Sequence, residues 1–463
     1  MTMKNVYFIG IGGIGMSAIA RYYNHAGYKV SGYDKTPSKL TANLEKEGIE
    51  IHFTSDVSFI PKDVENTLVI YTPAIPKDME ELVYVQENGY RLIKRSRALG
   101  EIAQEQKCIG VAGTHGKTTT STLLAHIYTH SGEGCSAFLG GISKNYHTNL
   151  LLSKNPVLVA EADEFDRSFL QLFPDVAIIT STDADHLDIY GDESTIKGAF
   201  AEFAGQIKAG GALILKKGVE IDLTNVKATV YSYSFKEEAD FSPCNVELLE
   251  GGYFRFSLRH PAYRTIGGKE VPAGVIEGCT VGIPGWVNVE NGIAAAAAAL
   301  LGGLEPGKVK DALAAFQGVE RRFDIHLNTP KVAYIDDYAH HPKEISSAIS
   351  SMRNIFPGRK LTAIFQPHLY TRTRDFAEEF AASLSLADEL VLLDIYPARE
   401  LPIEGVTSEI IFNRVNLDQK IMMKKEEVLG WLEDKEIDIL VTFGAGDIDR
   451  LIPPIAGMLG ERI

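Results

Sequence analysis

The segment GTHGKT at residues 113–118 has the residue types of a phosphate-binding loop. It follows a short apolar run at 108–112 and precedes a sequence that favours a helix, which is the context that such a loop requires. Glycines allow backbone N–H groups to face phosphate oxygens, and the helix start adds the positive end of its dipole. The first glycine of the general pattern is replaced by Val111. We expect Lys117 to bind the β- and γ-phosphates of a nucleotide and the Thr118 hydroxyl to coordinate Mg²⁺.

Two further apolar runs in this region, at 156–161 and 176–181, each lead into an acidic cluster. Because parallel strands end at the same edge of a sheet, we expect both clusters to lie beside the phosphate loop. Carboxylates gathered there would repel one another without a cation, so Glu161 and His186 are predicted metal ligands together with Thr118. Imidazole is an unusual ligand for Mg²⁺, so His186 would also suit Mn²⁺. The outer positions around such a site are Asp163, Glu164 and Asp185.

A second glycine-rich loop, GIGGIG at 10–15, follows an apolar run at 4–9. It opens a helix, and Asp34 stands nineteen residues after Gly15 at the end of the next strand. This spacing matches a dinucleotide-binding fingerprint, so an NAD-dependent oxidoreductase is one alternative. The residues themselves indicate only that an anionic nucleotide binds at the helix start.

Polar clusters also follow three predicted strands near the C-terminal end, at 331–335, 361–365 and 437–443. The sequences are DDYAHHP, QPHLYTRTR and GAGD. Because these strands alternate with helices, they are expected to form a parallel sheet whose clusters meet at one edge.

The alternation of strands and helices predicts an α/β protein with three domains. Residues 1–105 form a Rossmann-like domain, and residues 106–318 form a central P-loop ATPase-like α/β domain. Short alternating segments from about 228 to 283 predict an antiparallel β flap on that central domain. Residues 319–463 form a second Rossmann-like α/β domain.

The composition excludes several classes of protein. The chain has 463 residues and a formal net charge of −15, which argues against nucleic acid and anionic membranes as partners. Its four cysteines lack metal-ligand spacing, and no apolar run reaches membrane-spanning length. We expect a reduced, cytoplasmic protein that is a monomer or a weak homodimer.

The motifs together resemble those of the Mur ligase family over essentially the whole chain. The matching sequences are GIGGIGMS, GTHGKTTT, EADEFDRSF, DADHLDIYG, the Asn288/Asn291 pair, RRF, DDYAHHPKE, FQPHLYTRTRDF and GAGD. The DDYAHHP and QPHLYTRTRD sequences resemble the branch that acts on UDP-N-acetylmuramate.

The resemblance implies a ligase that uses ATP and Mg²⁺, or Mn²⁺, to join L-alanine to the carboxylate of UDP-N-acetylmuramate. The implied UDP-sugar-binding residues are Gly12, Gly13, Ile14, Gly15, Met16, Ser17, Asp34, Thr72 and Ala74. Those implied for ATP are Gly113, Thr114, His115, Gly116, Lys117, Thr118, Thr119, Asn288, Asn291, Arg322 and Asp337. The implied catalytic residues are Lys117, Glu161, His186, His341 and Arg372, and the amino-acid side carries His341, His368 and Arg372.

Three positions depart from the family's pattern. Val287 stands where a histidine usually precedes the Asn motif, and Leu369 replaces the first arginine of the QPHRYTRT sequence. The lysine that is carbamylated in some members has no assigned counterpart, since Lys197 lies too close to His186 in sequence.

Two alternatives to the alanine ligase remain besides the oxidoreductase. A recycling ligase that attaches the murein tripeptide to the same UDP-sugar shares most of these motifs. A non-catalytic nucleotide-binding regulator would keep the phosphate loop but would not need paired metal ligands or His368 and Arg372.

Overall fold

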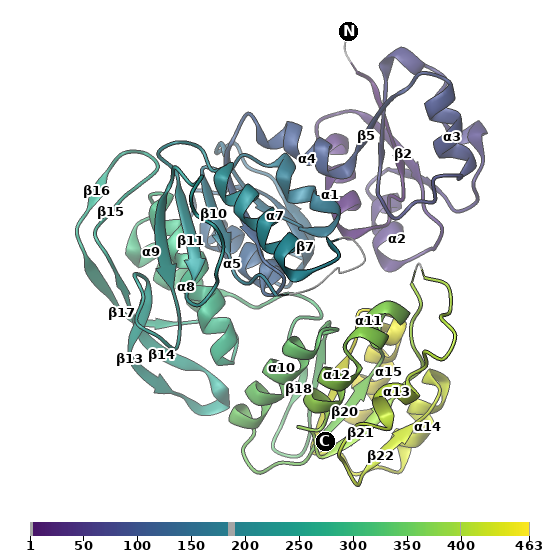
Figure 1. The fold of residues 1–463 in the computed structure, drawn as a ribbon, viewed down its shortest axis with the longest axis vertical. Coiled ribbons are helices and arrows are strands. Elements are labelled where there is room, and N and C mark those ends of the chain that lie inside the picture. Colours follow the sequence, from purple (N-terminus) through teal and green to yellow (C-terminus); the bar gives the residue numbers. More distant parts are fainter. Residues whose placement is uncertain (1–2, 184–189, 399, 463) are drawn as a thin grey trace. The chain divides into compact units, whose positions relative to one another are not determined.

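Apolar strands alternate with helices along the chain and form three largely parallel β-sheets with helices packed against them (Figure 1). The computed structural model describes residues 3–183, 190–398 and 400–462. The predicted α/β class is confirmed.

The N-terminal sheet has the strand order β3-β2-β1-β4-β5, and every pairing in it is parallel. Its strands are β1 (Asn5–Ile9), β2 (Lys29–Tyr33), β3 (Glu50–His52), β4 (Thr67–Tyr71) and β5 (Arg91–Lys94). The helices are α1 (Ile14–His25), α2 (Lys39–Lys46), α3 (Glu80–Glu87) and α4 (Arg95–Ala103), with short 3₁₀ turns η1 (Val57–Phe59) and η2 (Val64–Asn66). The glycine-rich loop at 10–15 joins β1 to α1, as predicted.

The central sheet has the order β12-β11-β10-β6-β9-β7-β8. Its strands are β6 (Lys107–Ala112), β7 (Ser136–Ser143), β8 (Thr148–Leu151), β9 (Val157–Glu161), β10 (Val176–Ile179), β11 (Ala212–Lys216) and β12 (Thr229–Tyr233). Its helical segments are α5 (Lys117–His130), η3 (Phe165–Gln171), α7 (Glu193–Gly205), α8 (Trp286–Leu301) and α9 (Pro306–Ala315). The parallel neighbours β10, β6 and β9 are the three strands that were predicted to end together. The described residues that follow these strands, such as Asp163 and Asp183, therefore lie at one edge.

The flap differs in part from the prediction. Residues 229–233 form β12, which pairs in parallel with β11 at the edge of the central sheet. The rest forms a three-stranded sheet, β13 (Ser242–Leu248), β14 (Phe254–His260) and β17 (Gly274–Thr280), interrupted by η4 (Glu250–Gly252). A small antiparallel pair, β15 (Tyr263–Arg264) and β16 (Glu270–Val271), lies between β14 and β17 in sequence.

The C-terminal sheet has the order β18-β19-β23-β20-β21-β22. It contains β18 (Asp324–Asn328), β19 (Ala333–Asp337), β20 (Leu361–Phe365), β21 (Glu389–Leu392), β22 (Lys420–Met422) and β23 (Ile439–Phe443). Only its β18/β19 pairing is antiparallel. The helical segments are α10 (Pro342–Ile355), α11 (Tyr370–Asp375), α12 (Ala377–Leu384), α13 (Glu409–Phe412), η5 (Lys425–Glu427), α14 (Val428–Glu433), η6 (Asp447–Leu451) and α15 (Ile452–Gly460).

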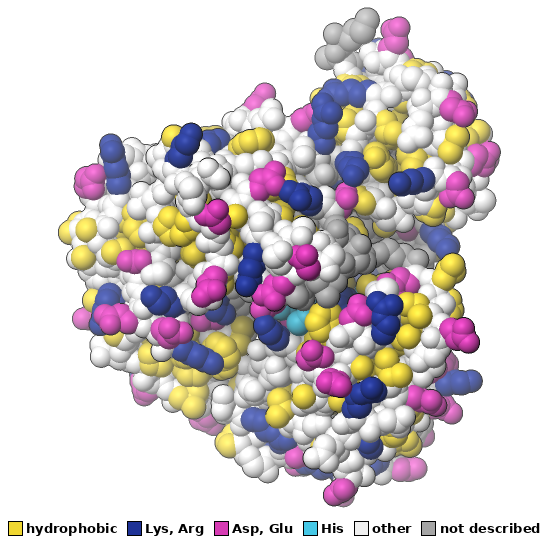
Figure 2. Space-filling model, in the orientation of Figure 1, with side chains coloured by type: hydrophobic (Ala, Val, Ile, Leu, Met, Phe, Trp, Pro, Cys, Tyr) yellow, Lys and Arg dark blue, Asp and Glu magenta, His cyan; other side chains and the backbone are white. Residues whose placement is uncertain are grey.

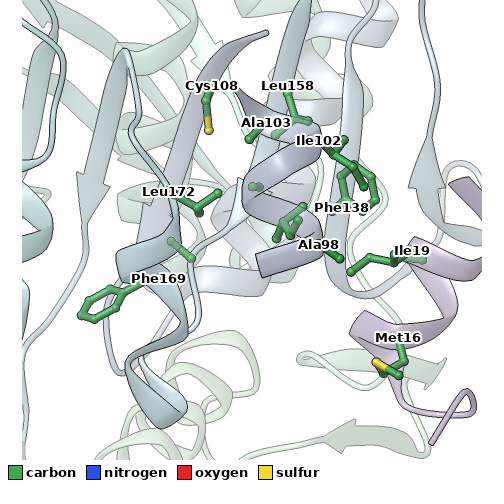
Figure 3. Close-up of a cluster of buried hydrophobic side chains, with 14 of the residues drawn as sticks. Met16, Ile19, Ala98, Ile102, Ala103, Cys108, Phe138, Leu158, Phe169 and Leu172 are labelled. Carbon is green, nitrogen blue, oxygen red and sulfur yellow. The ribbon is translucent and has the colours of Figure 1, made fainter. Parts of the chain in front are cut away.

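The described chain divides into two compact units. One contains the residues up to Val246 together with Phe256–Gly282 and Glu290–Gln317, and the other contains Glu247–Arg255, Ile283–Val289 and the residues from Gly318 onward. In the first unit the N-terminal and central sheets share one hydrophobic core. Figure 3 shows how side chains of α1, α4, β7, β9 and η3 meet in it. The predicted domain boundaries at 105/106 and 318/319 stay predictions.

Acidic and basic side chains are interspersed over the face shown in Figure 2. Among the described residues, no helix is both long enough and apolar enough to cross a membrane.

Candidate active site

The loop between β6 and α5 has a backbone that requires glycine at two places. Gly113 has φ of +133°, and a Cβ there would lie 2.0 Å from Thr180 Oγ1. Gly116 has φ of +80° and precedes the first residue of α5. No side chain caps this helix, and its first turn holds no acidic residue. Its N–H groups are therefore oriented for an anionic ligand.

The residues that follow β10 form hydrogen bonds with this loop. The hydroxyls of Thr114 and Ser181 lie 2.8 Å apart, and the N–H of His115 donates to Ser181 Oγ at 2.8 Å. Thr180 Oγ1 donates to the carbonyl oxygen of His115. These bonds tie the backbone of the loop to the residues that follow β10.

Lys117 lies folded back onto its own loop. Its Nζ donates to the Gly113 carbonyl oxygen at 2.5 Å and to Glu164 Oε1 at 2.9 Å. The Glu164 side chain is 1% exposed, and that of Lys117 is 13% exposed. Burial lowers the pKa of Lys117, but the carboxylates of Glu164, Asp163 and Glu161 outweigh burial and raise the pKa above its ordinary value. The ammonium therefore stays charged and available to phosphate oxygens.

Glu161 ends β9 directly beside the start of α5. Its Oε1 accepts a hydrogen bond from Thr118 Oγ1 at 3.1 Å, and its Oε2 accepts one from the N–H of Gly140 at 3.1 Å. A Cβ on Gly140 would lie 2.3 Å from both carboxylate oxygens, so any larger residue there would displace the Glu161 carboxylate. A hydroxyl and a carboxylate oxygen in contact are hard donors that fit a divalent cation such as Mg²⁺.

The predicted third metal ligand, His186, and Asp185 lie outside the described residues. Within the described ranges, no group of three or more His, Cys, Asp and Glu side chains is arranged to hold a metal ion. The predicted metal set of Thr118, Glu161 and His186 stays a prediction, of which the structure describes the adjoining first two members.

Asp163, predicted as an outer metal position, pairs with Arg95 of α4 at 3.0 Å. The Arg95 guanidinium also lies over Gly15, where an added Cβ would come within 2.8 Å of its Nη1. Lys94 similarly pairs with Asp166 at 2.8 Å. Sequence reasoning missed Arg95, although its place at the end of a parallel strand was a usable signal.

The loop at 10–15 is held by Asp34, whose Oδ2 accepts the N–H of Gly12 at 2.7 Å. Gly13 precedes α1 without a side-chain cap, which leaves that helix start open to an anion. Ser17 is fully buried, and its hydroxyl donates to the Ile14 carbonyl oxygen at 2.8 Å. Met16 is also buried.

Thr72 and Ala74 follow β4 at the same edge of the sheet, where Ala74 is exposed. A Cβ on Gly10 would lie 2.7 Å from Thr72 Cγ2, so this glycine also allows close packing. The UDP-sugar role of these residues stays a prediction.

The two asparagines predicted to contact adenine have different surroundings. Asn291 Oδ1 accepts a hydrogen bond from Thr120 Oγ1 at 3.3 Å, next to Gly116 of the phosphate loop. Asn288 Nδ2 donates to the Pro284 carbonyl oxygen at 2.7 Å.

In the second compact unit, β19 ends in two acidic residues, of which Asp336 is fully buried and Asp337 is partly exposed. Asp336 accepts hydrogen bonds from Arg321 Nε at 3.1 Å and Thr442 Oγ1 at 2.7 Å. Burial raises the pKa of Asp337 to about 7, although the nearby Arg322 guanidinium opposes the shift. The Arg322 guanidinium lies 4.8 Å from the centre of the Tyr338 ring.

The two adjacent histidines after β19 have different roles in the fold. His341 is 4% exposed, caps α10 by accepting the Lys343 N–H at 3.4 Å, and packs its ring against Phe376. His340 instead places its ring 5.9 Å from that of His368. The structure thus brings His340 to the predicted acceptor-side residues and uses His341 as a helix cap.

His368 and Arg372 lie together on the loop and helix that follow β20. Arg372 Nη1 is 3.5 Å from His368 Nδ1, and the His368 ring stacks on Tyr396 with centres 5.9 Å apart. Arg372 is 6% exposed. Leu369, which replaces the family's arginine, is buried and has φ of +72°.

Sequence profiles of one family cover most of the chain. The profile of the Mur ligase catalytic domain matches residues 5–107, that of the Mur ligase middle domain matches residues 111–299, and that of the Mur ligase glutamate ligase domain matches residues 321–446. The chain belongs to the Mur ligase family. The resemblance and the three-domain α/β architecture are confirmed.

Mur ligases with long, close matches to this chain come from several bacteria. The UDP-N-acetylmuramate–L-alanine ligase of Phocaeicola vulgatus is 49% identical over 468 residues, which cover 100% of this chain and 99% of that protein. The ligase of the same name from Flavobacterium johnsoniae is 46% identical over 463 residues, covering 100% and 99%.

Solved structures of Mur ligases share the fold. The UDP-N-acetylmuramate–alanine ligase of Thermotoga maritima is similar with a TM-score of 0.79 and 26% identity, covering 99% of this chain and 100% of that chain. The murein peptide ligase of Psychrobacter arcticus has a TM-score of 0.70 at 22% identity, covering 99% of both, which shows the fold alone.

Proposed function

We propose that this Mur ligase joins L-alanine to the carboxylate of UDP-N-acetylmuramate, converting ATP to ADP and phosphate. The product is UDP-N-acetylmuramoyl-L-alanine, a peptidoglycan precursor. The observation that carries this proposal is the set of relatives with that activity in their names, which are 46–49% identical over essentially the full chain. The phosphate loop supports it, with Thr118 in contact with Glu161 and Lys117 paired with Glu164.

The reaction needs ATP because a carboxylate does not react with an amine at neutral pH. Transfer of the γ-phosphoryl group to the sugar carboxylate gives an acyl phosphate, and the amine of alanine then displaces phosphate. Holding the carboxylate, the γ-phosphate and the amine in line contributes about 7–11 kcal/mol toward the barrier. The intermediate hydrolyses easily, so the site must exclude water.

Lys117 and the N–H groups that start α5 would bind the transferring phosphate and stabilise its charge. Thr118 and Glu161, with His186, would hold a divalent cation, for which we propose Mg²⁺ and allow Mn²⁺. A divalent cation at this place neutralises the approach of one anion to another. Lys117 also pairs with Glu164, so a phosphate bound at Lys117 would share or replace that carboxylate as its partner.

In the second unit, Arg322 and Asp337 are proposed to contact ATP, and Arg372 with His368 to bind the amino acid. The amine must be unprotonated to attack. His340, beside His368, is better placed than the helix cap His341 to take the proton from the attacking amine. The glycine-rich loop before α1 would hold the diphosphate of the UDP-sugar and not NAD.

The test is phosphate release from ATP and Mg²⁺ with UDP-N-acetylmuramate, adding L-alanine in one reaction and the murein tripeptide in another. Turnover with alanine alone is the expected result. Turnover with the tripeptide alone would assign the protein to the recycling ligases. Reduction of NAD with no phosphate release in either reaction would contradict the whole proposal.

A further inference from the structure

Asn149 is a fully buried polar residue on β8, the antiparallel edge strand of the central sheet. Asn149 is not among the predicted site residues. β8 pairs with β7, and β7 pairs with β9, the strand that ends in Glu161. Asn149 therefore belongs to the same rigid sheet as the phosphate loop and the candidate metal ligand.

The side chain of Asn149 reaches the helix of the other nucleotide loop. Its Nδ2 donates to the Ile14 carbonyl oxygen at 2.6 Å and to Ser17 Oγ at 3.0 Å. Both acceptors belong to the first turn of α1, directly after the uncapped Gly13. The central domain thus holds the turn whose N–H groups would receive the substrate's diphosphate.

The remaining atom of the amide, Oδ1, accepts a hydrogen bond from Arg21 Nη1, farther along α1. Arg21 is 6% exposed, and its other nitrogens donate to Glu47 at 2.8–3.0 Å. A buried arginine that loses a partner carries a large desolvation cost. The polar contacts of Asn149 are therefore all directed at α1, and the orientation of its amide is fixed by an acceptor-only carbonyl and a donor-only guanidinium.

We propose that Asn149 is a positioning residue, which sets the distance between the sugar carboxylate and the γ-phosphate by fixing the start of α1 to the central sheet. In this proposal the UDP-sugar binds at α1 and ATP binds at the central sheet. A shift of α1 relative to that sheet would therefore move one reactant away from the other. This role rests on the proposed function. A misplacement of about 1 Å between reacting groups can reduce a rate about 100-fold.

The test compares Asn149→Ala and Asn149→Asp with the wild type. The Asp variant keeps the side-chain size and an acceptor for Arg21, but it has no N–H to donate to the Ile14 carbonyl oxygen. We expect both variants to reduce kcat with alanine on the order of 10-fold or more, with an unchanged KM for ATP. The acyl phosphate would be attacked by water more often, so phosphate release should exceed product formation.

Asn155→Ala is the matched control. Asn155 Nδ2 donates to the Gly134 carbonyl oxygen at 2.9 Å, a comparable bond in the same domain that does not involve α1. We expect this variant to keep kcat and the ratio of phosphate to product. Thermal melts of all variants show whether the Ala substitution prevents folding, in which case the Asp variant decides.

Wild-type turnover is measured first, so that the two ideas fail separately. A wild type that does not turn over UDP-N-acetylmuramate and alanine would overturn the proposed function and the role of Asn149 with it. An active wild type, together with a folded Asn149→Asp variant of equal kcat and equal phosphate-to-product ratio, would overturn the role of Asn149 alone.

Discussion

Lys117 and Glu164 form a buried ion pair inside the loop that would hold the phosphates of ATP. Each side chain satisfies the other, so ligand binding has to exchange a carboxylate partner for a phosphate one. Removing one member takes the oppositely charged partner away from the other, at a position where little water can replace it. The pair therefore affects both the free energy of unfolding and ADP formation. A single substitution changes both quantities at once.

We predict that Lys117→Ala lowers ADP formation by about 10²–10³-fold or more, because a charge on the transferring phosphoryl group loses its partner. UDP-sugar binding, measured by calorimetry, should remain nearly intact since α1 is not touched. The same substitution should cost roughly 3–5 kcal/mol of stability, because it removes the ammonium that pairs with the buried Glu164 carboxylate.

The double variant Lys117→Ala/Glu164→Gln separates these effects. It also removes the charge of Glu164, so urea unfolding should show most of the stability restored while ADP formation stays as low as in Lys117→Ala. Recovery of ADP formation in the double variant would show that Lys117 acts only by holding Glu164.

Asp337 makes stability depend on pH. Burial raises its folded-state pKa from 3.8 to about 7, so between these values the folded protein holds a proton that the unfolded chain has lost. The stability that this proton contributes is fully present below the unfolded pKa and is lost as pH rises through the folded one. The slope approaches about 1.4 kcal/mol per pH unit within that window.

We therefore predict that Asp337→Asn unfolds less readily than the wild type at pH 8, and that the difference shrinks toward pH 5. Urea unfolding at both values measures this. An equal pH dependence in variant and wild type would mean that Asp337 is ionised throughout.

At the scale of elements, the turn between β6 and α5 leaves no space for a side chain at Gly113 or Gly116. We predict that Gly113→Ala destabilises the protein by about 1–3 kcal/mol from its backbone conformation alone, and further through the contact with Thr180 Oγ1. ATP binding should weaken with it, as measured by calorimetry.

Gly198, in the middle of α7, is the control for this substitution. A Cβ there meets no atom within 4 Å. Gly198→Ala should raise stability by about 0.4–1 kcal/mol, because alanine restricts the unfolded chain. If both variants lost stability equally, the geometry of the loop would not be the cause.

The elements that carry the site could be predicted from the sequence, because apolar runs followed by glycine or acidic clusters have one simple arrangement in a parallel sheet. The hairpin of β7 and β8 could not, since its residues 136–151 are rich in Gly, Ser and Asn and lack a clear alternation. β12 was read as part of the flap because an exposed edge strand has the same alternating texture as a hairpin.

Some site residues could likewise be predicted from the local sequence, and others could not. Lys117, Thr118 and Glu161 follow from local spacing, and Thr118 lies in contact with Glu161. The difference between His340 and His341 could not be predicted, because it depends on which of them caps α10. Asn149 acts through residues far away in sequence, and no local pattern marks it. Arg95 also pairs with a distant residue, Asp163, and only its place directly after β5 could have marked it.

For the whole molecule, the two compact units have separate hydrophobic cores. Both tryptophans, Trp286 and Trp431, belong to the second unit. Fluorescence therefore reports on that unit alone, whereas far-UV circular dichroism reports on both.

We predict that UDP, which would bind the first unit, shifts only part of the urea transition. In a Trp286→Phe variant, the fluorescence of Trp431 should keep its midpoint. The part of the dichroism transition that belongs to the first unit should move to higher urea by the equivalent of about 2.7 kcal/mol at 100 times the dissociation constant. Coincident transitions at every UDP concentration would show that the chain unfolds as one cooperative body.

The acidic residues around the phosphate loop also bear on which form of the nucleotide can enter. Glu161, Asp163 and Glu164 lie close enough to Lys117 to affect its proton affinity, so they also repel a nucleotide that arrives with its full negative charge. The same carboxylates attract a nucleotide that already carries a divalent cation. The loop thus selects between two forms of one nucleotide by charge, and the free cation concentration of the cell sets how much usable substrate this enzyme meets.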